Sequence, residues 1–117
     1  MTNPLQLTDI EIAQKYINKS RNAADKGHEF TLSLTEFMRL MKRKTCYYTG
    51  VHLQNEYLTN ANGRTLDRID NKLGYVKGNV VTCSFYFNQL KSAIEDNNTD
   101  FTADRVLLGI KKIKKGN

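Results

Sequence analysis

The sequence has no tryptophan, a single proline and two cysteines among its 117 residues. Two cysteines in a basic chain do not make a disulfide framework, which favours a reduced, cytoplasmic setting. The chain also lacks an apolar run long enough to cross a membrane, and its first residues lack the apolar core of a signal peptide. The sequence therefore predicts neither a disulfide-stapled secreted domain nor a membrane partner.

Acidic residues are fewer than basic ones. The 18 Lys and Arg against 12 Asp and Glu give a formal net charge of +6, with an isoelectric point near 9.4. This balance favours a polyanionic partner such as nucleic acid, although a soluble basic protein without such a partner would share it. Hydrophobic residues make up 39% of the chain, which is enough for the modest core of one small domain.

Two capping boxes predict the starts of N-terminal helices. Thr8 is followed three residues later by Glu11, and Ser33 by Glu36. The first helix should end at Gly27. Its apolar face is predicted from four residues at helical spacing, and that of the second helix from four more. These two sets are Ile10, Ala13, Ile17 and Ala24, and then Leu34, Phe37, Met38 and Met41.

The C-terminal part also has helical patterns. Ser84 is a plausible N-cap for a helix running to Glu95 or Asp96, and Thr102 can cap a last helix. The last helix is expected to turn four apolar residues inward and to carry a basic tail. The apolar residues are Val106, Leu107, Ile110 and Ile113, and the tail contains Lys111, Lys112, Lys114 and Lys115.

The chemistry-bearing stretch lies between these helical regions, in residues 65–92. A strand-like run ends in Asp67 and Asp70, a loop contains Gly74, and a short apolar run leads into a helical pattern with Asn88 and Lys91. A strand, loop, strand and helix in this order can bring a carboxylate and an amide oxygen together. Hard cations such as Mg²⁺ take oxygen ligands of these kinds. The Asn62-Gly63 turn signal predicts a hairpin between Tyr57-Leu58-Thr59 and Arg64-Thr65-Leu66.

This stretch resembles the HNH, or ββα-metal, endonucleases, in the phage and bacterial subgroup that lacks zinc cysteines. The resemblance is carried by Leu66-Asp67-Arg68-Ile69-Asp70-Asn71, Gly74-Tyr75, Asn79-Val80-Val81, and Asn88 with Lys91, and more weakly by Cys46-Tyr47-Tyr48-Thr49-Gly50. It implies an α+β fold with a ββα-metal core in residues 45–96. Residues 1–44 would be a helical extension, and residues 97–117 a basic C-terminal helix.

The resemblance also implies a metal-dependent DNA endonuclease that hydrolyses phosphodiester bonds, nicking or cutting DNA in a bacterial or phage-infected host cell. Asp67 and Asn88 would ligate Mg²⁺ or Mn²⁺, and Asn79 would tie the loop between the strands. Spacing alone favours a simpler interpretation, in which Asp67 caps a turn and Asn88 is an exposed helix residue; the whole motif favours the ligand roles.

The general base is where the sequence departs from the family, because Arg68 stands where many relatives have a histidine. Arginine stays protonated, so Arg68 is interpreted as a clamp on the phosphate or the transition state. Asp70, Tyr75 or a metal-bound hydroxide remain as the base. His28 and His52 lie outside the motif and are predicted to be structural or surface residues.

Further positions are assigned to DNA or to packing. Predicted substrate contacts are Lys91, Tyr75, Arg64, Lys15 and Lys19, although the lysines could instead be solvated surface charges. No structural zinc is expected, because only one of the four zinc-ligand positions of related nucleases is a thiol. An aromatic cluster is predicted in its place, formed by Tyr47, Tyr48, Phe85 and Phe87.

Two other functions fit the same residues. The missing histidine and thiols favour a nuclease-derived protein that binds nucleic acid but is catalytically weak or inactive. The basic surface also fits a factor that binds an acidic protein partner. A domain this small makes few base contacts with DNA, so the sequence also allows a homodimer.

Overall fold

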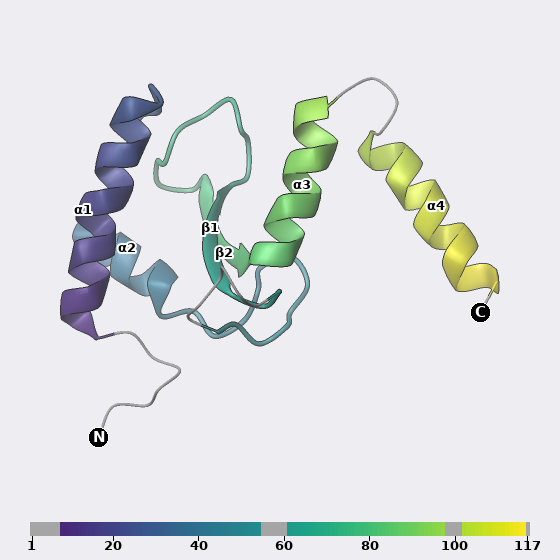
Figure 1. The fold of residues 1–117 in the computed structure, drawn as a ribbon, viewed down its shortest axis with the longest axis horizontal. Coiled ribbons are helices and arrows are strands. Elements are labelled where there is room, and N and C mark those ends of the chain that lie inside the picture. Colours follow the sequence, from purple (N-terminus) through teal and green to yellow (C-terminus); the bar gives the residue numbers. More distant parts are fainter. Residues whose placement is uncertain (1–7, 55–60, 98–101, 117) are drawn as a thin grey trace.

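The computed structural model describes residues 8–54, 61–97 and 102–116. This part of the chain contains four helices and one two-stranded antiparallel sheet (Figure 1). The elements are α1 (Asp9–Asp25), α2 (Leu34–Met41), β1 (Arg64–Arg68), β2 (Val80–Ser84), α3 (Phe85–Asn97) and α4 (Ala103–Gly116). The predicted α+β fold class is confirmed.

The N-terminal helices begin at their predicted caps. The Thr8 hydroxyl accepts the Glu11 N–H at 3.2 Å, and the Ser33 hydroxyl accepts the Glu36 N–H at 3.1 Å, with the reciprocal glutamate bonds present in both. Helix α1 ends before Gly27, whose φ of 75° is accessible to glycine at little cost. The predicted capping boxes and helix stop are therefore confirmed.

The buried face of α1 differs from the predicted one. Ile10 and Ile17 are 73% and 48% exposed, whereas Ile12 is fully buried. The reason lies one turn beyond Ile12, where the Tyr16 hydroxyl donates to the Leu32 carbonyl at 2.6 Å. This bond and the edge-to-face packing of the Tyr16 ring against Phe30 and Phe37 turn the Ile12 side of the helix inward. The expectation was wrong for Ile10, Ile17 and Ala24, which are all exposed, and Ala23 is buried in place of Ala24.

The sheet separates two environments, because successive side chains of a strand point to opposite faces. Asp67 pairs with Val81, and Leu66 pairs with Thr82. Leu66 enters the main core with residues of α1 and α2, while Asp67 points to the opposite face, where α3 lies (Figure 1). The main core consists of Ile12, Leu32, Phe37, Met41, Leu66 and Val80.

Helix α3 follows β2 directly. The Ser84 hydroxyl accepts the Phe87 N–H at 3.2 Å, which confirms the predicted cap. The helix runs to Asn97, slightly beyond the predicted end at Glu95 or Asp96.

Helix α4 begins after its predicted cap, since the Thr102 hydroxyl accepts the Arg105 N–H at 3.3 Å. Its apolar side chains are not inward, however, and no residue of α4 is buried. Ile113 is 66% exposed. The helix stands apart from the hairpin in Figure 1, so its apolar side does not reach the core. The inward prediction for Val106, Leu107, Ile110 and Ile113 was wrong.

Two remaining observations complete the fold. In the described part of the chain, no helix is long and apolar enough to cross a membrane. The predicted strand Tyr57-Leu58-Thr59 lies outside the described residues, while Gly63 forms a bridge with Gln54.

Replacing Phe37 with alanine should lower the free energy of unfolding by about 3–5 kcal/mol, because its buried ring fills the centre of the main core. Urea unfolding followed by circular dichroism measures the change. The matched control is Leu108→Ala on α4, where the side chain is 59% exposed and the change should stay within about 0.5 kcal/mol. Equal effects of the two variants would contradict this placement of the core.

Candidate active site

Asp67 is the central acidic residue of the face covered by α3. It is 7% exposed, and its Oδ2 atom accepts a hydrogen bond of 2.5 Å from the Tyr48 hydroxyl. The Lys91 ammonium lies 3.4 Å from the same oxygen. A buried carboxylate is stable only when it is paired and hydrogen-bonded, and Tyr48 and Lys91 supply both requirements.

Lys91 is held in place by further contacts. Its Nζ donates to the Arg68 carbonyl at 2.9 Å and pairs with Glu95, one turn later on α3. Only 14% of the Lys91 side chain is exposed. Of the two interpretations of Lys91, solvated surface charge or site residue, the structure supports placement in the site, with the ammonium against Asp67.

Asn88 precedes Lys91 by three residues, so it lies on the same face of α3, about one turn closer to the helix start. It is partly buried, and its side chain makes no hydrogen bond within the described residues. The hydrogen bond from Tyr48 and the ion pair with Lys91 are both made to the Asp67 Oδ2 atom. A carboxylate oxygen and an amide oxygen with unused lone pairs fit a hard cation such as Mg²⁺, with water and phosphate completing its shell.

A larger protein-only metal site is absent from the described residues, where no three His, Cys, Asp or Glu side chains gather. Any cation at Asp67 and Asn88 would therefore keep several non-protein ligands. It would also meet the Lys91 ammonium, which already pairs with Asp67.

Asn79 ties the loop between β1 and β2. Its Oδ1 accepts the Asp70 N–H at 2.9 Å, and its Nδ2 donates to the Asp70 carbonyl at 3.1 Å and the Gly74 carbonyl at 2.9 Å. Asn79 is 6% exposed. The side chain thus satisfies buried backbone groups on both arms of the loop, which is the scaffolding role that the sequence predicts for it.

The same loop docks on the connection between α1 and α2. A Cβ atom on Gly74 would lie 2.4 Å from the Glu29 carbonyl oxygen, so only glycine fits this approach. Next to it, the Tyr75 N–H donates to that carbonyl at 2.7 Å, and Tyr75 forms a parallel bridge with Phe30. The loop is therefore fixed from inside by Asn79 and from outside by Glu29.

Arg68 points away from Asp67, because the two residues are adjacent in β1. Its Nη1 atom donates to the carbonyls of Asn71 and Leu73 at 2.9 and 3.1 Å. The same nitrogen lies 3.3 Å from His28 Nδ1. In this arrangement Arg68 braces the loop, and its predicted action on a phosphate would require part of this bracing to open.

His28 is a neighbour of the loop that lies far from it in the sequence. Because arginine only donates, His28 Nδ1 must accept, which assigns the proton to Nε2. Partial burial, followed by the nearby charges of Arg68, Lys26 and Lys19, lowers the pKa of His28. The imidazole is therefore neutral near pH 7, in keeping with its predicted structural role.

Tyr75 and Lys19 belong to the same cluster. The Lys19 ammonium lies 4.9 Å from the centre of the Tyr75 ring, and the Arg68 guanidinium lies 5.4 Å from it. These are cation–π distances. Two predicted substrate contacts, Tyr75 and Lys19, are thus brought together beside Arg68, whereas Lys15 is exposed farther back on α1.

The other two predicted residues lie in different settings. Asp70 is exposed, and its Oδ1 atom accepts the Lys72 N–H at 2.9 Å, so it shapes the loop while keeping a carboxylate oxygen accessible. Arg64 is 7% exposed and donates to the Arg43 carbonyl from Nε and Nη2, at 3.2 and 2.8 Å. Arg64 is thus a structural tie within this fold.

The predicted aromatic cluster forms around Tyr48. Its ring stacks on Phe87 with ring centres 4.6 Å apart, and the Tyr47 ring, although 64% exposed, packs edge-to-face against Tyr48 with ring centres 5.1 Å apart. Tyr48 also packs against Cys46 and Cys83, which are both free thiols and buried. Burial and the charge of Asp67 raise the pKa of Cys83 to about 12.

Cys46 differs from Cys83. Burial alone would raise its pKa, but hydrogen bonds from the Thr49 side chain and from the backbone N–H groups of Ser84, Thr49 and Tyr48 lower the pKa to about 7. The turn that follows Cys46 closes through the Gly50 N–H, which donates to the Cys46 carbonyl at 2.9 Å.

Two site residues were missed by the sequence reasoning. Glu95 stands four residues after Lys91, a spacing that favours ion pairs on a helix and could have indicated it. Tyr48 gave no such signal, because its partner Asp67 is 19 residues away and on another element.

Comparisons with known proteins give viral relatives. The chain is 35% identical over 82 residues to "Uncharacterized protein R423" of Acanthamoeba polyphaga mimivirus, covering 70% of this chain and 14% of that protein. It is 26% identical over 82 residues to "Uncharacterized 29.0 kDa protein in dda-modA intergenic region" of Enterobacteria phage T4, covering 70% of this chain and 32% of that protein. The chain thus spans less than a third of each relative's length.

No model of a known protein family matches the chain. No solved structure matches it either. The names of the two viral relatives state no activity, so the similarity carries no function to this chain.

Replacing Asn79 with alanine should lower the free energy of unfolding by about 1–3 kcal/mol, because it leaves buried backbone groups of the loop without partners. Urea unfolding measures the loss. The control is Asn71→Ala in the same loop, where the side chain is exposed and little change is expected. A stable Asn79→Ala variant would show that the loop does not depend on this side chain.

Proposed function

We propose that the chain is a metal-dependent DNA endonuclease of the HNH type, with a ββα-metal core and with Mg²⁺ or Mn²⁺ as its cofactor. The observation that carries the proposal is the placement of Asp67 on β1 against the face of α3 that holds Asn88 and Lys91. Asp67, Asn79 and Asn88 thereby belong to one strand–loop–strand–helix unit. Asn79 fixes the loop of this unit.

Asp67 and Asn88 would hold the cation, which offsets negative charge on the scissile phosphate and on the leaving oxygen. The neighbouring residues prepare this site. Tyr48 orients the Asp67 carboxylate through its hydroxyl, and burial followed by this hydrogen bond raises the pKa of Tyr48, so Tyr48 remains a donor. Asp70 is the proposed base, because its carboxylate is the exposed acceptor of the loop that follows β1.

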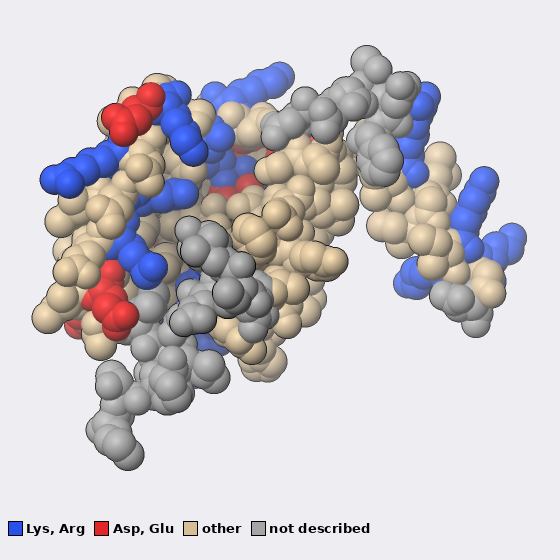
Figure 2. Space-filling model, viewed as in Figure 1, with Lys and Arg blue, Asp and Glu red and all other residues tan. Residues whose placement is uncertain are grey.

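Phosphate contacts would come from the basic surface. Figure 2 shows Lys and Arg side chains spread over α1 and α4 on the face drawn. Lys19 and Arg68 both lie against the Tyr75 ring and would supply phosphate contacts beside the loop. Contacts of this kind position DNA without reading its sequence. A dimer, which would extend the contact surface, stays a prediction.

One observation favours a second candidate function, a catalytically inactive nucleic-acid-binding protein. The Asp67 Oδ2 atom is already bonded by Tyr48 and paired with Lys91. A fold that satisfies its buried carboxylate internally does not need a metal to be stable. In this alternative, the basic surface would bind DNA while the bonds of the phosphate backbone stay intact.

Plasmid cleavage with Mg²⁺ or Mn²⁺ separates the two. The wild type should nick or cut, and Asp67→Asn and Asn88→Ala should each lower the rate by about 100-fold or more, because each removes a metal ligand. Asp70→Asn should lower the rate without weakening metal binding. Asp104→Asn on α4 is the matched control, as it makes the same chemical change at an exposed carboxylate. Absence of cleavage with either metal, with salt-sensitive DNA binding intact, selects the binding protein.

Lys91 should compete with the metal for Asp67. Lys91→Met should therefore tighten Mn²⁺ binding by about tenfold, because it removes a positive charge 3.4 Å from the carboxylate. Electron paramagnetic resonance of free Mn²⁺ measures the affinity without any need for activity. Lys72→Met, at an exposed loop lysine, should leave it unchanged. Equal affinities of wild type and Lys91→Met would show that the ammonium and the metal do not share this carboxylate.

A further inference from the structure

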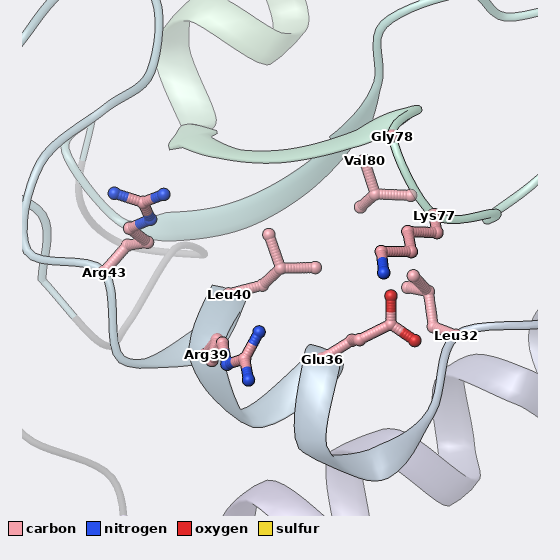
Figure 3. A pocket seen from close by; sticks show the side chains of 8 residues that line it. All are labelled: Leu32, Glu36, Arg39, Leu40, Arg43, Lys77, Gly78 and Val80. Atoms are coloured by element: carbon pink, nitrogen blue, oxygen red, sulfur yellow. The ribbon is translucent and has the colours of Figure 1, made fainter.

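A group of basic side chains lies on the face of the sheet opposite Asp67. A cavity of about 180 Å³ opens between α2 and the loop residues that precede β2 (Figure 3). It is smaller than the ~300–1,000 Å³ of pockets that enclose whole small molecules. Its size suits one unit of a polymer that continues beyond the opening.

Positive charge surrounds this cavity. Arg39 lines the cavity from the last turn of α2, and Arg43 lines it from two residues beyond the end of that helix. Lys77 lines it from the loop between the strands. Glu36 is the one carboxylate in the lining, which leaves three cations against one anion. Two independent segments thus place their basic side chains around one opening, which is the arrangement expected of an anion site.

The floor of the cavity is apolar. Leu32, Leu40 and Val80 form it, and Val80 belongs to the main core. A floor of this kind offers nothing to a free inorganic anion, but it fits the carbon ring of a sugar. Cations above an apolar floor therefore match a phosphate joined to deoxyribose, which is the repeating unit of a DNA backbone.

Glu36 narrows the choice of anion. Its carboxylate accepts the Ser33 N–H at 3.1 Å, and the hydrogen bonds from Ser33, followed by the charges of Lys77 and Arg39, lower its pKa. It therefore stays ionised and repels negative charge. A phosphodiester carries one negative charge and a terminal phosphate nearly two at neutral pH, so the Glu36 carboxylate, taken by itself, repels a terminal phosphate more strongly than a phosphodiester.

The position of the cavity relates it to the candidate active site. Val80 pairs with Arg68 in the sheet, so the cavity and the loop after β1 lie at the same end of the hairpin. Asp67 points to one face at this end, and the cavity opens on the other. One nucleic-acid backbone passing around this end would meet both.

We propose that the cavity bordered by Arg39, Arg43 and Lys77 binds a phosphodiester of the DNA backbone, as an anchoring subsite away from the bond to be cut. This proposal rests on the proposed nuclease function and adds to it a site that anchors the DNA. DNA binding at the cavity is nevertheless measurable without cleavage, so the two can fail separately.

The test is fluorescence anisotropy of a labelled DNA duplex in EDTA, over a series of salt concentrations. Arg39→Gln and Lys77→Gln should each weaken binding by about three- to tenfold and reduce the slope of log affinity against log salt by about one. Lys44→Gln is the matched control, since Lys44 is an exposed neighbour that does not line the cavity. Its effect should be clearly smaller.

Glu36→Gln supplies a change of opposite sign. Glutamine preserves the capping box at the start of α2, so the helix should remain intact while one negative charge leaves the cavity. DNA binding should tighten by about threefold. Weaker binding in the two cation variants together with tighter binding in Glu36→Gln supports the subsite, because general loss of folding cannot give both signs.

Other outcomes overturn the assignment. Equal losses of DNA affinity in Arg39→Gln, Lys77→Gln and Lys44→Gln would show that the cavity residues act only as ordinary surface charges. Failure of the wild type to bind the DNA duplex would contradict the subsite. A change of affinity for an RNA duplex in the variants, without a change of affinity for the DNA duplex, would contradict it as well. Cleavage that persists when Asp67 or Asn88 is replaced would count against the proposed metal site alone. The subsite would then still be judged by the binding data.

Discussion

The pairing of Asp67 is the interaction on which the arrangement of the core depends. A carboxylate that is 7% exposed must find donors inside the protein, and they come from two other segments. Tyr48 brings the turn after Cys46 to the sheet, and Lys91 brings α3. The stacking of Tyr48 on Phe87 then joins the turn to α3 itself. Three segments are thus oriented around one side chain, which is also a ligand in the proposed metal site.

A second constraint acts on the loop between the strands. Asn79 holds its two arms together, and the close approach of Gly74 to Glu29 fixes it on the connection between the N-terminal helices. Because the loop cannot move freely, Lys77 is presented next to α2. The same docking holds Arg68 beside His28. One rigid loop therefore holds both basic side chains in place at this end of the hairpin, Lys77 on one side and Arg68 on the other.

Local patterns predicted the parts of this fold that local physics determines. The caps at Thr8, Ser33 and Ser84 involve groups three residues apart, and so the sequence shows them directly. The loop-tying role of Asn79 was predicted from the family resemblance, and the geometry agrees. Features set by contacts between distant segments were missed.

The buried face of α1 illustrates such a distant contact. Ile10 and Ile12 are equally apolar, and the choice between them is made by Tyr16, whose partner Leu32 lies beyond the helix. Likewise, the amphipathic pattern of α4 predicts an apolar face but cannot supply a surface to cover it. The partners of Lys91 and the direction of Arg68 required the sheet and α3 to be placed first. Burial, charge pairing and side-chain direction at the site are thus tertiary properties.

Lys91 connects stability with the proposed chemistry. Removing one partner of a buried ion pair costs about 3–5 kcal/mol, because the other charge is left unpaired. Exchanging the ammonium for a divalent cation avoids this cost, since Asp67 stays paired throughout and Lys91 keeps Glu95 as a partner. The metal-free fold can therefore be stable without preventing metal binding. In the proposed nuclease, the choice between cutting DNA and only binding it would then depend on one local exchange of cations at Asp67.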